Sequence, residues 1–116
     1  MSDAITDIWF FSDVELPELT DHLELTDRVC DSGIDWGWVS GKLLDFKLDI
    51  VRRSPSESQP AQTRIFLFEK ELPFSQHFIH HLVMRLRELG ISPVYCGTWM
   101  PEKNGGFTQH IVSVET

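Results

Sequence analysis

The segment Phe74–Gly90 has the most regular pattern of apolar residues in the chain, and it constrains the fold most strongly. Its apolar side chains recur at intervals of three and four residues, which is the period of an α-helix. They are Phe78, Ile79, Leu82, Val83, Leu86 and Leu89. Ser75 can cap the first turn, and Gly90 can take the left-handed conformation that ends a helix. We therefore predict an amphipathic helix whose apolar stripe is covered by strands on either side.

Five segments have the composition of β-strands. Ile5–Ser12 and Arg64–Phe68 are apolar runs of the kind found in the middle of a sheet. Trp36–Arg53 alternates apolar and charged residues, which predicts one long strand with one buried face. Val94–Trp99 and Gln109–Val114 are shorter and complete the set.

The remaining segments predict one short helix and two loops. Leu19 and Leu23 have helical spacing, and Pro17 is tolerated in a first turn, so we predict a helix over Pro17–Leu25. Asp27–Asp35 is rich in polar residues and is predicted to be a loop. Positions 54–63 are rich in Pro, Ser and Gln, which favours a mobile hairpin loop.

The predicted order is β-α-β-β-α-β with an extra C-terminal strand. This order is typical of a ferredoxin-like α+β sandwich, with an antiparallel sheet and both helices on one face. The 116 residues fit one domain, 1–116. Right-handed crossovers would place the first strand beside the strand Arg64–Phe68. The fold itself says little about function, since it hosts many activities.

The charge is concentrated in the N-terminal half of the chain. The net charge is −8, of which the first 49 residues contribute −9 and the rest +1. Within Asp13–Asp35, eight carboxylates face one cation, Arg28. This pattern argues against direct binding of nucleic acid, which needs clusters of Lys and Arg. It favours a basic protein partner that is attracted electrostatically.

The acidic segment and two nearby tryptophans are the predicted partner-binding surface. Trp36 and Trp38 lie two residues apart, so on a strand they share a face, as interface anchors often do. The full predicted set is Asp13, Glu18, Asp21, Glu24, Asp27, Asp31, Asp35, Trp36 and Trp38. The function predicted from it is a small, non-catalytic acidic module. Such a module would occlude a basic site on a toxin or nucleic-acid enzyme, as immunity proteins and inhibitors do.

Two alternatives come from other functional classes. The strands Val94–Trp99 and Gln109–Val114 could pair copies of the chain into a homodimer that binds or senses a small ligand. His77 and His81 are four residues apart and could hold a metal ion for an enzyme, but no further ligands lie near them in the sequence. We therefore predict no catalytic residue, no metal and no cofactor.

The compartment is predicted from absent signals and from the cysteines. No apolar run approaches the length of a membrane span, and the first residues do not resemble a signal peptide. Cys30 and Cys96 lack metal-ligand spacing. We therefore expect a cytoplasmic chain with two reduced thiols and no membrane partner.

Overall fold

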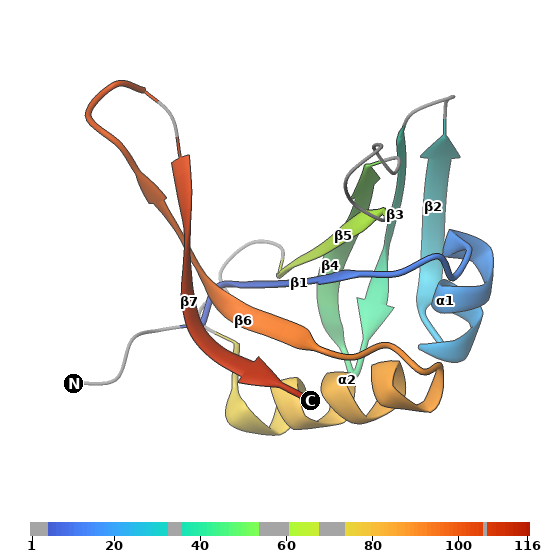
Figure 1. Cartoon of the computed structure of the whole chain (residues 1–116). Helices are drawn as coiled ribbons and strands as arrows, with labels where there is room; N and C mark the ends of the chain where they lie inside the picture. The colour runs from blue at the N-terminus through green and yellow to red at the C-terminus, as the bar shows by residue number, and fades with distance from the viewer. Residues whose placement is uncertain (1–4, 33–35, 54–60, 68–73, 106) are drawn as a thin grey trace.

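The computed structural model describes residues 5–32, 36–53, 61–67, 74–105 and 107–116 (Figure 1). These residues form seven strands and two helices, and all seven strands belong to one sheet. In chain order they are β1 Asp7–Phe11, α1 Leu16–His22, β2 Thr26–Ser32, β3 Trp36–Leu43, β4 Phe46–Arg53, β5 Gln62–Leu67, α2 Gln76–Glu88, β6 Val94–Pro101 and β7 Phe107–Glu115.

The ferredoxin-like prediction is wrong. The strands form one antiparallel sheet in the order β2-β3-β4-β5-β1-β6-β7, and not a split β-α-β sandwich with two helices packed on one face. The predicted neighbour of the first strand is correct, since β1 pairs with β5, but the pairing is antiparallel. Strands β2 to β5 form a meander in which each strand runs antiparallel to the one before it. The last strand of this meander, β5, runs in the direction opposite to β1.

Two errors in the local predictions explain why five strands were predicted and seven are observed. The predicted single strand Trp36–Arg53 is a hairpin, with Leu44 and Asp45 both at positive φ in a two-residue turn. The predicted loop Asp27–Asp35 contains most of β2, an edge strand paired with β3. Positions 33–35, like positions 54–60 of the predicted hairpin loop, lie outside the described residues.

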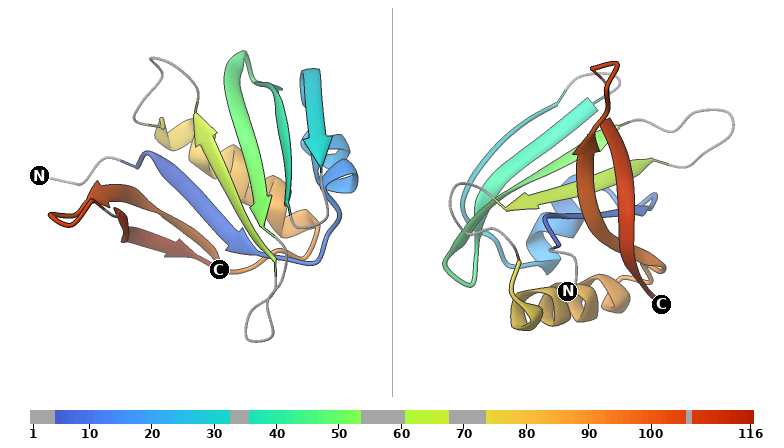
Figure 2. Two further views of the ribbon diagram at one scale, coloured as in Figure 1. Left: turned by 90° about the horizontal axis from the view of Figure 1, so that it is seen from above. Right: turned by 90° about the vertical axis from the view of Figure 1, so that its left-hand side faces the viewer.

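Helix α2 forms as its sequence predicts. The Ser75 hydroxyl accepts a hydrogen bond from the backbone N–H of Phe78 at 3.1 Å, which caps the first turn. Gly90, at φ +78, follows the last turn. The predicted stripe is buried from Phe78 to Leu86, and Leu89 is half-buried. Figure 2 shows α2 lying along one side of the sheet.

One core lies beneath the sheet. It combines the α2 stripe with Ile8 of β1, Ile50 of β4 and Ile65 of β5, and Leu19 of α1 joins the same cluster. Figure 1 places α1 beside β2 at one end of the sheet, and the β6–β7 hairpin at the other end. Neither helix in the described parts of the chain has the length and apolar character needed to cross a membrane.

Candidate protein-binding surface

Helix α1 and its flanking segments bring seven exposed carboxylates to one end of the molecule. Pro17 occupies the first turn, where its missing N–H costs no hydrogen bond, and Glu18 is favoured there by the helix dipole. Leu19 and Thr20 are buried, so the acidic residues of the helix point outward. The seven are Asp13, Glu15, Glu18, Asp21, Glu24, Asp27 and Asp31. We call them, with the groove described next, the acidic surface.

A groove of about 420 Å³ lies between α1 and strands β2 and β3. It is lined by Leu16, Pro17, Thr20, Asp21, Arg28, Cys30, Asp31, Trp38 and Val39. The apolar members supply walls, and Asp21 and Asp31 place carboxylates among them. This combination suits a long cationic side chain, whose aliphatic stem packs on apolar walls while its charge meets a carboxylate.

Trp38 also lines a second hollow, of about 430 Å³. Asp27, Val29 and Lys42 are among its other residues. Trp38 is half-buried and therefore borders two depressions next to the edge strand β2. A large aromatic side chain in this position is typical of an interface anchor.

Two of the carboxylates are paired with cations from β2 and β3. Arg28 donates to Asp21 through Nη1, and to the carbonyl oxygen of Leu25 through Nε at 2.7 Å. Lys42 Nζ lies 3.4 Å from Oδ2 of Asp27. These carboxylates are exposed, so the pairs contribute little to stability, about 0–1 kcal/mol each.

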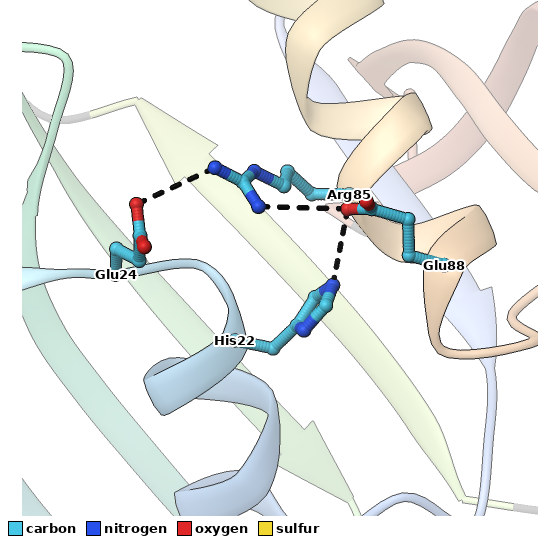
Figure 3. A network of polar contacts seen from close by, with 4 residues as sticks. All are labelled: His22, Glu24, Arg85 and Glu88. Carbon is cyan, nitrogen blue, oxygen red and sulfur yellow. Dashed lines mark hydrogen bonds and ion pairs between the residues drawn. The ribbon is translucent and has the colours of Figure 1, made fainter.

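A third carboxylate, Glu24, is bound to α2 (Figure 3). Arg85 Nη2 lies 3.4 Å from Oε2 of Glu24, and Nη1 of the same guanidinium lies 3.6 Å from Oε1 of Glu88. His22 Nε2 lies 3.2 Å from that same Glu88 oxygen. The network links the C-terminal end of α1 to the last turns of α2. Glu24 is as exposed as Asp21 and Asp27, so this contact also contributes little to stability.

Asp13 and Glu15 lie near a fourth cation, Arg52. Burial lowers the pKa of Arg52, and the two carboxylates raise it. Arg52 also donates to the carbonyl oxygen of Val14 and, at 2.9 Å, to the Thr63 hydroxyl. With Glu88, which shares Arg85, eight carboxylates against the four cations Arg28, Lys42, Arg52 and Arg85 leave this part of the surface with four net negative charges.

The predicted site residues divide into three groups. Asp21, Asp31 and Trp38 meet in the groove, although they come from three different elements. Asp13 and Glu18 are exposed outside it, whereas Asp27 lines the second hollow. Glu24 forms an ion pair with Arg85 of α2.

The last two predicted residues are not placed as side chains. Asp35 lies outside the described residues, and for Trp36 the description covers the backbone pairing with Arg53. Sequence reasoning missed the groove walls Leu16 and Pro17, and it identified Arg28 as the opposing cation without placing it in the groove. The spacing of Leu19 and Leu23 predicted a helix but could not show which residues the helix would contact.

The histidines and cysteines form no cluster in the described chain. His77 and His80 are exposed and His81 is half-buried, and no group of three or more potential metal ligands occurs among the described residues. Cys30 is exposed and Cys96 is buried, and both are free thiols.

Comparisons with known proteins give no relative. No family model, no curated protein and no solved structure matches this chain. The functional proposal below therefore rests on the chemistry of the acidic surface.

Proposed function

We propose that the chain is a cytoplasmic, non-catalytic protein-binding module that uses the acidic surface to occlude a basic site on a partner protein. The observation that carries the proposal is the groove, in which Asp21, Asp31 and Trp38 lie around apolar walls. A partner's Lys or Arg would pack its stem against the apolar walls Leu16 and Pro17 and place its charge among the groove carboxylates. The surrounding carboxylates would speed association by attracting the basic partner.

The roles of the seven carboxylates differ within this proposal. Asp21, Glu24 and Asp27 each have an internal cation, so part of their charge is already compensated. Replacing these three by Lys would place like charges beside Arg28, Lys42 and Arg85, and would change these local contacts as well as binding. Glu18 is better suited to a binding test, since it is exposed and has no ion pair with any described residue.

The test is affinity capture from the native host, with wild type and matched charge-reversal variants. Glu18→Lys and Asp31→Lys change the acidic surface. Glu102→Lys makes the same charge change in the β6–β7 turn, at the other end of the sheet, and is the control. We expect a basic protein to be recovered by wild type and by the control, and lost from both acidic-surface variants. Equal recovery by all four proteins would contradict the proposal.

A further variant tests the groove itself. Trp38→Ala removes the aromatic wall without changing charge. If Trp38 is an anchor, this change weakens binding of the captured partner by about 30-fold, a typical loss for a hot-spot residue. Unchanged affinity in this variant would limit the interaction to the exposed carboxylates.

A further inference from the structure

The C-terminal hairpin carries almost no charge. Positions 94–101 and 107–114 contain no Asp, Glu, Lys or Arg, although 24% of the whole chain is charged, and Glu115 stands at the end of β7. Figure 1 shows the hairpin projecting away from the α1 end of the sheet. The molecule therefore combines an acidic end with a hairpin whose strands are almost uncharged, with Glu102 and Lys103 in the turn between them.

Strand β7 is an open edge of the sheet. It is last in the strand order and pairs with β6 alone. At its end, Arg87 of α2 donates to the backbone oxygen of Thr116. Among the described residues, no strand or helix lies along the outer side of β7. Its outer backbone N–H and C=O groups are thus available to another strand.

Two large apolar side chains of β7 face solvent. Ile111 is 51% exposed and Val114 is 47% exposed. The register pairs Ile111 with Gly97 and Val114 with Tyr95, and an extra residue in β7 lies between these pairs. This bulge turns Ile111 and Val114 to the same face of the sheet, because a spacing of three would otherwise place them on opposite faces.

The other edge of the sheet is protected in a different way. β2 carries Asp27, Arg28 and Asp31, and its register with β3 is also irregular. Charged side chains on an edge strand oppose pairing with another strand. β7 has a bulge, and its one Asp, Glu, Lys or Arg residue, Glu115, stands at its end. The two edges therefore differ in their capacity for self-association.

We propose that β7 pairs with β7 of a second copy, antiparallel and around a two-fold axis. Each copy carries a net charge of −8, so contacts through the acidic surface are repulsive, whereas an edge whose one charged side chain is the terminal Glu115 reduces this repulsion. An isologous antiparallel pair supplies backbone partners to both edges at once. The exposed Ile111 and Val114 of the two copies cover one another.

This arrangement leaves the acidic surface accessible in both copies. β2 and β7 are opposite edges of the same sheet, so a dimer through β7 carries its two grooves at its two far ends. Such a dimer is bivalent, and a partner assembly with two basic sites would bind it with avidity. The dimer does not depend on the proposed function, and either proposal can fail alone.

The test measures mass by sedimentation equilibrium over a range of concentrations. We expect wild type to be a dimer, Ile111→Lys to be a monomer, and Val29→Lys to remain a dimer. Val29 is the matched control, since it is 60% exposed on the opposite edge. Circular dichroism checks that each variant is folded, and protection of β7 amides from hydrogen exchange should fall in Ile111→Lys alone.

Salt gives a second, independent readout. Added salt should strengthen the dimer because it screens repulsion between the two acidic copies. A monomeric wild type at every salt concentration would overturn the proposal, as would a dimer that Ile111→Lys leaves intact.

Discussion

Asp7 and Arg64 form an ion pair across neighbouring strands, with Arg64 Nη2 3.2 Å from Asp7 Oδ2. The carboxylate of Asp7 is 1% exposed. Its other oxygen, Oδ1, is buried without a hydrogen-bond partner in the described chain. The guanidinium carbon of Arg64 lies 4.3 Å from the centre of the Phe66 ring. Burial raises the pKa of Asp7 to about 6, against the lowering effect of Arg64.

This raised pKa predicts a pH-dependent loss of stability. The folded chain binds a proton at Asp7 more tightly than the unfolded chain, whose Asp pKa is near 3.8. The contribution of Asp7 is therefore fully present below about pH 4 and is lost as pH rises through about 6. The loss amounts to about 3 kcal/mol, from about 1.4 kcal/mol per unit of pKa.

Asp7→Asn should remove this part of the pH dependence, because Asn resembles the protonated acid and does not titrate. Denaturant unfolding of both proteins at pH 4 and pH 7 measures the difference. A loss of stability between the two pH values that is equal in wild type and variant would show that Asp7 does not titrate in this range.

The two cysteines should differ strongly in reactivity. Burial raises the pKa of Cys96 to about 11, although a hydrogen bond with Ser113 lowers it. Cys30 is exposed at the groove. In the folded protein Cys30 should react rapidly with a thiol reagent. Cys96 should react about 100-fold or more slowly, because it is buried and the thiolate is the reactive form.

Cys30→Ser is the control for this prediction. It should abolish the fast reaction and leave the slow one, and unfolding should expose Cys96. Two fast thiols in the folded wild type would contradict the burial of Cys96.

The α2 stripe should dominate the stability of the core. Leu82 is fully buried, so Leu82→Ala should lower the free energy of unfolding by about 2–5 kcal/mol, from lost burial and the cavity left behind. Met84 is 45% exposed on the same helix, and Met84→Ala should cost less than about 0.5 kcal/mol. Denaturant titration compares the two, and similar losses in both would mean that α2 packs through another face.

Capping residues and apolar periodicity predicted an element correctly where both lie within that one element. Ser75, Gly90 and the apolar stripe predict α2 because capping and periodicity are local properties. The turn at Leu44–Asp45 was missed, since it contains no Gly or Asn and leucine is unusual at positive φ. The alternation of buried residues shifts by one position at this turn. Odd-numbered positions are buried up to Leu43, and even-numbered positions are buried from Leu48.

Strand β2 and the groove depend on contacts between distant segments. β2 lies at an edge and has no apolar alternation, so its composition indicates a loop. The acidic composition of the surface was evident from the sequence. Its internal pairing was not, because Lys42 and Arg85 approach Asp27 and Glu24 through the tertiary fold.

The most direct test of the central claim is the salt dependence of affinity for the captured basic partner. Wild type should bind more weakly as salt rises, mainly through slower association, and Glu18→Lys should bind more weakly with a smaller salt dependence. Glu102→Lys should retain the wild-type behaviour. An affinity that does not change with salt, or is equal in wild type and Glu18→Lys, would contradict a binding site on the acidic surface.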